Sequence, residues 1–145
     1  MRLENNTGCL PERAPGWFQL RVFRTQLARE KKSTQNIVFM DRSKIDGVAY
    51  FRFAGLKPPA WMTRRIKSET PYDIVFFLDF PTYKQEDERP ENEAQARHLA
   101  DLTFRTYQDF GYEPVRVPPR KEPCERAAHL LKLALATKTK KLSIE

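Results

Sequence analysis

The sequence predicts an α/β fold with a three-layer, mostly parallel sheet and helices on both faces. Two short, almost continuous apolar runs, residues 36–41 and 72–79, have the character of strands buried on both faces. Amphipathic segments of helical periodicity alternate with these runs, and strands separated by helices pair in parallel through crossovers. The chain has 145 residues, which suits one core. We expect an irregular arm over 1–15, a single domain over 16–137 and a basic flexible tail over 138–145.

The first half of the chain should begin with a helix over residues 16–32. Its apolar stripe has spacings of three and four and consists of Trp17, Leu20, Phe23 and Leu27. The run 36–41, Asn-Ile-Val-Phe-Met-Asp, follows as a buried strand. Ser43 and Asp46 then form the S-x-x-D start of a second helix, which continues to Phe53.

Gly55 should end that second helix, and Pro58 and Pro59 break the chain before a short basic helix from Trp61 to Lys67. The second buried strand, residues 72–79, comes next. It leads into a charged loop over residues 80–92.

The third part of the chain predicts a long helix over residues 91–110, with Gly111 just beyond its end. A weaker strand over 113–118 and a last helix over 123–137 complete the fold. Ala127, Leu130, Leu131 and Ala134 should point inward from that helix. Ligands of parallel sheets bind beyond the carboxyl ends of the strands, which directs attention to Asp41 and to Asp79 with the loop after it.

Composition excludes several classes of protein. The longest apolar run is far too short to span a membrane, and the first residues lack the apolar segment of a secretion signal. Cys9 and Cys124 are isolated, which excludes a disulfide framework and a zinc ribbon and favours a cytoplasmic protein with reduced thiols. The net charge of +7 is unevenly spread: residues 1–70 carry +8, residues 71–120 carry −4 and residues 121–145 carry +3. A basic surface in the first half could attract phosphate groups.

The strongest chemical feature is the run of four apolar residues that ends in Asp41 and Arg42. This is the Walker-B arrangement, in which the carboxylate holds Mg²⁺ near the phosphates of a nucleotide. The adjacent arginine can clamp phosphate oxygens. The alternative is a strand-end aspartate that only caps the next turn. Asp46 likewise has two alternative roles: it caps the helix, or it accepts a hydrogen bond from a substrate hydroxyl.

The loop from Lys84 to Glu93 is a second candidate, because it lies at the expected carboxyl edge and could close over a ligand with an arginine. A solvated linker is the alternative for these residues. His98 and His129 lack the neighbours that a metal site needs.

Several pieces in order resemble one known family. They are Trp17-Phe-Gln-Leu-Arg-Val, Gln26-Leu-Ala-Arg-Glu30, Val38-Phe-Met-Asp-Arg-Ser43, Asp46-Gly-Val-Ala-Tyr50, Tyr72-Asp-Ile-Val-Phe-Phe-Leu78, Arg89-Pro-Glu-Asn-Glu93 and Phe110-Gly-Tyr-Glu-Pro-Val115. About residues 16–130 resemble the NadR-type AAA domain of the P-loop NTPases, in the branch of ATPases and nucleoside-type kinases.

This resemblance implies a nucleotide-binding domain that uses ATP or GTP with Mg²⁺. It would hydrolyse the nucleotide or transfer its phosphate to a small molecule. In that case Asp41 matches the Walker-B acid and metal ligand, Arg42 the phosphate-contacting arginine, and Arg89 the arginine of a lid. Glu93 and Arg97 would support the lid, and Asp46 would contact nucleotide or substrate.

One part of the family pattern does not occur in the sequence. The motif G-x-x-x-x-G-K-[ST] cannot be fitted to its five glycines, and it contains no Gly-Lys pair. We therefore expect a truncated or split domain without Walker A that is catalytically impaired alone. A non-catalytic protein-interaction module is the alternative from another class. Nucleic acid is a weaker third partner, which the positive charge alone supports.

The resemblance also implies a gap in the sheet. The P-loop strand of such kinases lies between the two strands that here would be 36–41 and 72–79. Without it, each strand would present unpaired backbone groups, which cost about 1–3 kcal/mol apiece when buried. We therefore expect direct pairing of the two strands, filling of the gap by residues 1–14, or a strand from another chain or a second copy in a homo-oligomer. Residues 1–14 are a poor filler, because Glu4-Asn-Asn-Thr-Gly8 has low strand propensity.

Overall fold

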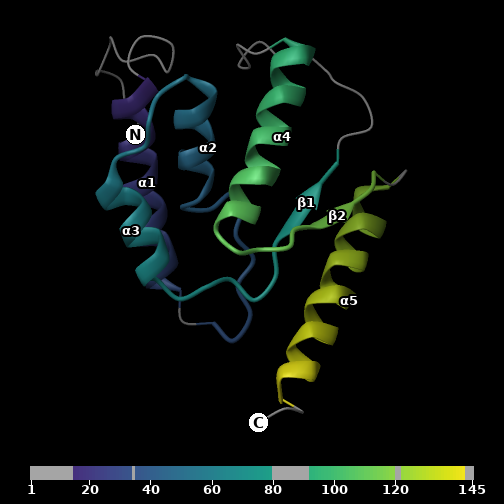
Figure 1. The fold of residues 1–145 in the computed structure, drawn as a ribbon. Helices are drawn as coiled ribbons and strands as arrows, with labels where there is room; N and C mark the ends of the chain where they lie inside the picture. Colours follow the sequence, from purple (N-terminus) through teal and green to yellow (C-terminus); the bar gives the residue numbers. More distant parts are fainter. Residues whose placement is uncertain (1–14, 34, 80–91, 120–121, 143–145) are drawn as a thin grey trace, which may run out of the picture.

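The computed structural model describes residues 15–33, 35–79, 92–119 and 122–142, and the predicted arm lies almost wholly outside them. The described part is mostly helical (Figure 1). Helices α1, α2 and α3 lie together on one side, α4 stands in the middle, and the two strands lie beyond it with α5. In chain order the elements are α1 (Pro15–Lys32), α2 (Asp46–Phe53), α3 (Ala60–Ser68), β1 (Phe76–Leu78), α4 (Glu93–Asp109), β2 (Val115–Val117) and α5 (Pro123–Leu142).

The sheet of the described residues consists of β1 and β2, which pair in parallel with Phe76 opposite Val115 and Leu78 opposite Val117. Helix α4 connects them, as a parallel pair requires. The α/β class and the parallel pairing are therefore confirmed. The sheet is much smaller than predicted, because both strands are only three residues long and the described residues contain no third one.

The prediction of a buried strand over residues 36–41 is wrong. These residues form bends and irregular backbone, and Ile37, Val38 and Phe39 are 39%, 43% and 56% exposed. A strand is stable only when a neighbour accepts and donates its backbone hydrogen bonds. Within the described ranges β1 and β2 bond to each other, and neither bonds to this segment. The apolar character predicted burial, but among the described residues no strand pairs with this segment.

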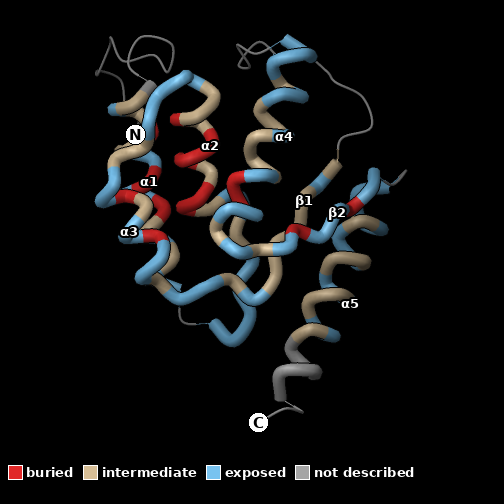
Figure 2. Tube along the Cα trace, in the orientation of Figure 1, coloured by how far each residue is buried: buried red, intermediate tan, exposed pale blue. Residues whose placement is uncertain are grey.

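The core lies among the helices and not over the sheet (Figure 2). Its buried members come from α1 to α4 and from the turn before α2: Phe23, Ile45, Val48, Phe51, Met62, Ile66 and Tyr107. Leu20 and Leu27 pack against this cluster as expected, whereas Trp17 on the same predicted stripe is 49% exposed. Gly47 faces Met62 so closely that an added Cβ would come within 2.9 Å of the methionine methyl group.

The helix ends follow local sequence signals. Asn92 accepts from the Gln95 amide and Gln95 reaches back to the Asn92 amide, both at 2.9 Å, which forms a complete capping box for α4. Gly55 and Gly111 adopt positive φ angles after α2 and α4, as predicted. Helix α5 continues to Leu142. No described helix is both long and apolar enough to cross a lipid bilayer.

Arginine 126 joins α5 to the carboxyl ends of both strands. Its Nη2 donates to the carbonyl oxygen of Asp79 at 2.6 Å and to that of Val117 at 2.7 Å. The Asp79 amide also donates to the Val117 carbonyl, which extends the ladder by one bond. Of the four inward residues predicted on α5, Leu130 and Ala134 are half-buried, whereas Ala127 and Leu131 are exposed.

Candidate functional site

Asp41 and Arg42 lie in an exposed turn directly before α2. Their position differs from the predicted one, since they follow irregular backbone and not a strand. Arg42 has a φ of 64°, which makes it the one non-glycine residue with a positive φ in the described chain. L-residues rarely occupy this region, because Cβ crowds the backbone, and such strain concentrates at functional sites.

Contacts from two helices surround Arg42. Its carbonyl oxygen accepts a hydrogen bond from Nε2 of Gln26 on α1 at 2.8 Å. Its guanidinium donates to the hydroxyl of Tyr50 on α2 at 3.1 Å and lies 5.8 Å from the centroid of that ring. The guanidinium is nevertheless exposed, so further donors remain available for an anion such as a phosphate.

Asp46 lies at the start of α2 and is held by two donors. Its Oδ2 accepts from the Ser43 amide at 2.7 Å and from the hydroxyl of Tyr107 on α4 at 2.8 Å. The predicted S-x-x-D pair is thus half formed, because the Ser43 hydroxyl accepts from Ile45 and not from Asp46. That hydroxyl also lies 2.6 Å from the Tyr107 hydroxyl. Burial and the nearby Asp46 carboxylate raise the pKa of Tyr107, which keeps it a neutral donor.

A second polar cluster fixes the backbone just after Ser43. Lys44 is 3% exposed, and its ammonium donates to Glu30 of α1 at 2.9 Å. The other oxygen of Glu30 accepts from Tyr72 at 2.6 Å, and the Lys44 ammonium lies 4.5 Å from the Tyr72 ring centroid. Burial and the hydrogen bond to Glu30 raise the pKa of Tyr72. The residue directly after the turn and Ser43, Lys44, is therefore held in place by Glu30 and Tyr72.

Glu93 and Arg97 pair with each other at 2.7 Å on the exposed first turns of α4. Tyr107, which touches Asp46, lies on the last turns of the same helix. At 1.5 Å per residue, Glu93 is roughly 20 Å and Arg97 roughly 15 Å from Tyr107 along the helix axis. The structure therefore does not bring these two residues to Asp46. Arg89 lies outside the described residues.

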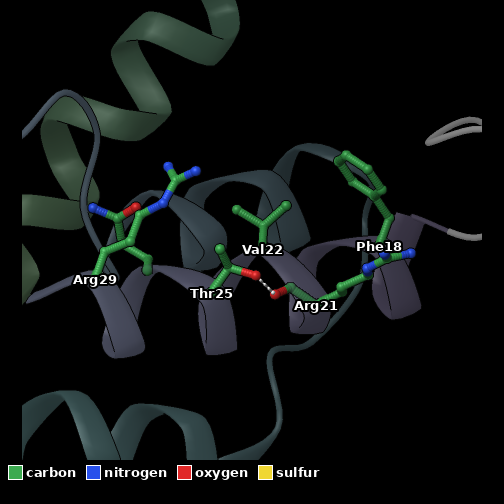
Figure 3. A pocket seen from close by; sticks show the side chains of 6 residues that line it. Phe18, Arg21, Val22, Thr25 and Arg29 are labelled. Carbon is green, nitrogen blue, oxygen red and sulfur yellow. Dashed lines mark hydrogen bonds between the residues drawn. The ribbon is translucent and has the colours of Figure 1, made fainter. Parts of the chain in front are cut away.

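A shallow hollow of about 270 Å³ lies along the outer face of α1 (Figure 3). Arg21 and Arg29 line it together with the apolar side chains of Phe18 and Val22, and Thr25 donates to the Arg21 carbonyl. Gln26 also lines this hollow, so the hollow adjoins the turn of Arg42.

The donor set fits Mg²⁺ only as a partner of a bound nucleotide. The described residues contain no group of three metal-ligating side chains, and Asp41 offers one exposed carboxylate. Mg²⁺ commonly takes one or two carboxylates, several waters and the oxygens of substrate phosphates. The single exposed carboxylate of Asp41, with the exposed guanidinium of Arg42 on the next residue, is compatible with that mode of binding.

The strand pair agrees with one class of protein, and a family model identifies the family. A parallel strand pair joined through a helix, with an acid and an arginine exposed on one turn, is consistent with part of a P-loop fold. The chain belongs to the AAA domain family, whose model matches residues 1–126. This membership implies P-loop NTPase-like nucleotide binding. No curated protein and no solved structure matches the chain significantly.

Sequence reasoning missed the polar residues that support the turn. Gln26, Glu30, Lys44 and Tyr72 make their contacts across 14 to 42 positions of the chain, which a local motif does not reveal. One signal was available. Gln19, Gln26 and Glu30 share the buried side of α1 with Phe23, and polar residues on an apolar stripe need partners when buried.

Proposed function

We propose that the chain is a nucleotide-binding domain of the NadR type that contacts Mg²⁺·ATP or Mg²⁺·GTP through the turn of Asp41 and Arg42. The observation that carries the proposal is this turn: an exposed carboxylate and an exposed guanidinium on adjacent residues in a member of the AAA domain family. The carboxylate suits a hydrated magnesium ion, and the guanidinium suits the phosphate oxygens beside it. Arg89 would act as a lid arginine, supported by Glu93 and Arg97, and Asp46 would contact nucleotide or substrate.

Catalysis by these 145 residues should be weak. Their sequence contains no Walker A motif, so the backbone amides, the lysine and the hydroxyl that cradle the phosphates are not supplied by it. These groups provide much of the electrostatic stabilisation of phosphoryl transfer. Where they are provided together with this domain, the reaction would be nucleotide hydrolysis or phosphate transfer to a small molecule in the cytoplasm.

The test is a titration of the chain with MgATP and MgGTP, followed by the amide NMR signals. The charge pairs at Asp41 and Arg42 are exposed and contribute about 1 kcal/mol each, so we expect dissociation constants of about one millimolar or weaker. Asp41→Asn and Arg42→Gln should each weaken binding about fivefold. Micromolar affinity would contradict a site of so few contacts.

Two matched variants control for general charge effects. Asp101→Asn on α4 and Arg64→Gln on α3 remove the same charges from exposed helix positions. They should leave the dissociation constant within about twofold of the wild type. If binding saturates and Asp41→Asn and Arg42→Gln behave like these controls, the nucleotide does not contact the turn and the proposal is wrong.

A second candidate is a non-catalytic interaction module, and one observation favours it. Ile37, Val38 and Phe39 form a continuous exposed run with high strand propensity in irregular backbone. Such a segment can pair with a strand of another chain or of a second copy. Absence of any nucleotide-dependent shift, together with self-association that charge substitutions in this run abolish, would favour this candidate.

A further inference from the structure

We propose that Gln26 is a positioning residue: it holds the backbone of Arg42 in its left-handed conformation and so fixes the direction in which Asp41 and Arg42 leave the surface. The inference rests on the proposed function only in that Asp41 and Arg42 contact the nucleotide. The backbone geometry that carries it is independent of nucleotide binding.

The backbone of Arg42 is strained. A φ of 64° is easy for glycine and acceptable for asparagine, but it is unfavourable for arginine. A residue keeps such a conformation only when the contacts around it enforce it. The side chain of Arg42 does not supply that enforcement, because its contacts with Tyr50 are at the end of a long exposed chain.

The peptide unit between Arg42 and Ser43 is hydrogen-bonded at both ends. Its carbonyl oxygen accepts from Gln26 of α1 at 2.8 Å, and its N–H donates to Asp46 of α2 at 2.7 Å. A rotation of this planar unit would break both bonds together. The unit is therefore clamped between two helices that pack directly against each other.

The two hydrogen bonds at the ends of this peptide unit, from Gln26 and to Asp46, form a clamp whose members are themselves constrained. Gln26 is 7% exposed and lies in the middle of α1, next to Leu27 and one turn after the fully buried Phe23. Its amide donates to the Arg42 carbonyl, and a polar side chain buried to this degree depends on such a partner. Asp46 is equally constrained, since Tyr107 donates to the same oxygen. Neither end of the clamp can follow a displaced turn.

The experiment measures amide hydrogen exchange at Ser43 by NMR in the full chain. Gln26→Met keeps the length of the side chain and removes its donor, so exchange at Ser43 should accelerate about tenfold relative to the other amides of α1 and α2. Thr25→Ala, an exposed change on the same helix, should leave Ser43 unaffected. Adding Arg42→Gly to Gln26→Met should return the Ser43 rate to within about threefold of the wild type, because glycine adopts the positive φ without help.

Three results would overturn the inference. Equal acceleration over all of α1 and α2 would mean that Gln26 only supports the core. An unchanged Ser43 rate in Gln26→Met would show that the clamp does not hold the peptide unit, and no recovery with Arg42→Gly would show that strain at residue 42 is not what Gln26 opposes. If the exchange pattern is as expected and no variant binds MgATP, the clamp stands and only the proposed function fails.

Discussion

Tyr107 shows how one buried hydroxyl ties the proposed site to the core. Its hydroxyl lies within hydrogen-bonding distance of both Asp46 and Ser43, while its ring packs in the helical core. The neighbouring carboxylate and the low exposure both favour the neutral phenol. A group of this kind links the stability of the fold to pH on the alkaline side.

Tyr107→Phe should therefore flatten the loss of stability at high pH. Because the pKa of Tyr107 in the folded chain is raised above its ordinary value of 10.0, its contribution is complete below pH 10 and declines as the pH rises further. Each tyrosine of this kind lowers the free energy of unfolding by about 1.4 kcal/mol per pH unit in that range. Urea melts at pH 8, 10 and 11 check this.

The variant Tyr72→Phe is the matched comparison, since burial and Glu30 raise the pKa of Tyr72 as well. Each single variant should keep part of the alkaline slope, and the double variant should keep the least. If the slope is the same in the wild type and in both single variants, the two phenols do not control alkaline unfolding.

At the scale of single residues, the sequence identifies candidate residues of the turn but not the contacts that surround them. Asp41 and Arg42 stand out as candidates because an apolar run that ends in an acid is a local signal, and the structure places both on one exposed turn. Their backbone conformation and its partner Gln26 were not recognised. The bond from Gln26 crosses 16 positions, and nothing in the neighbouring residues announces a positive φ at an arginine.

At the scale of elements, the capping box at the start of α4 should contribute measurably to the stability of the fold. Asn92→Ala should lower the free energy of unfolding by about 1 kcal/mol, because the capping box loses the acceptor for the Gln95 amide. Glu93→Gln breaks the exposed pair with Arg97 and should cost less than 0.5 kcal/mol, as surface pairs of this spacing contribute about 0.3–0.5 kcal/mol. Chemical denaturation of the two variants separates them, and equal losses would contradict the dominance of the cap.

The helices were predictable because their signals are local. Stripes of three and four, glycines after the last turn and prolines before the first predict α1 to α4 close to their observed bounds. Helix α5 continues to Leu142, beyond the predicted end at residue 137 and into the segment predicted as a tail. Strands depend on a neighbour that the local sequence does not contain. Residues 72–79 have that neighbour in β2 over three residues, whereas residues 36–41 have none among the described strands and remain exposed.

At the scale of the whole molecule, the exposed run of Ile37 to Phe39 and the short sheet suggest that the isolated chain is only marginally stable. The structure removes one of the earlier alternatives, since residues 36–41 do not pair with β1. We expect self-association at micromolar concentrations and an unfolding free energy below about 5 kcal/mol, the lower end for ordinary domains.

Dilute-solution X-ray scattering and a denaturant melt check this prediction. Val38→Lys and Phe39→Glu place charges in the exposed run and should shift the chain toward a monomer. The same charges placed at Ala54 and Thr63 are the controls and should leave the self-association unchanged. A wild-type chain that is a compact monomer with a single cooperative transition above 5 kcal/mol would show that the fold is closed without a partner.

The bond pattern of Arg126 has a kinetic consequence. Strands β1 and β2 are joined through α4, and Arg126 of α5 donates to the carbonyl groups of Asp79 and Val117 at their carboxyl ends. Contacts of such long sequence separation form late in folding, whereas a helix with a complete cap forms early. The order of events would thus run from α4 to the ladder and end at Arg126. The carboxyl edge of the strand pair would then be the last part of the described fold to become ordered and the first to open.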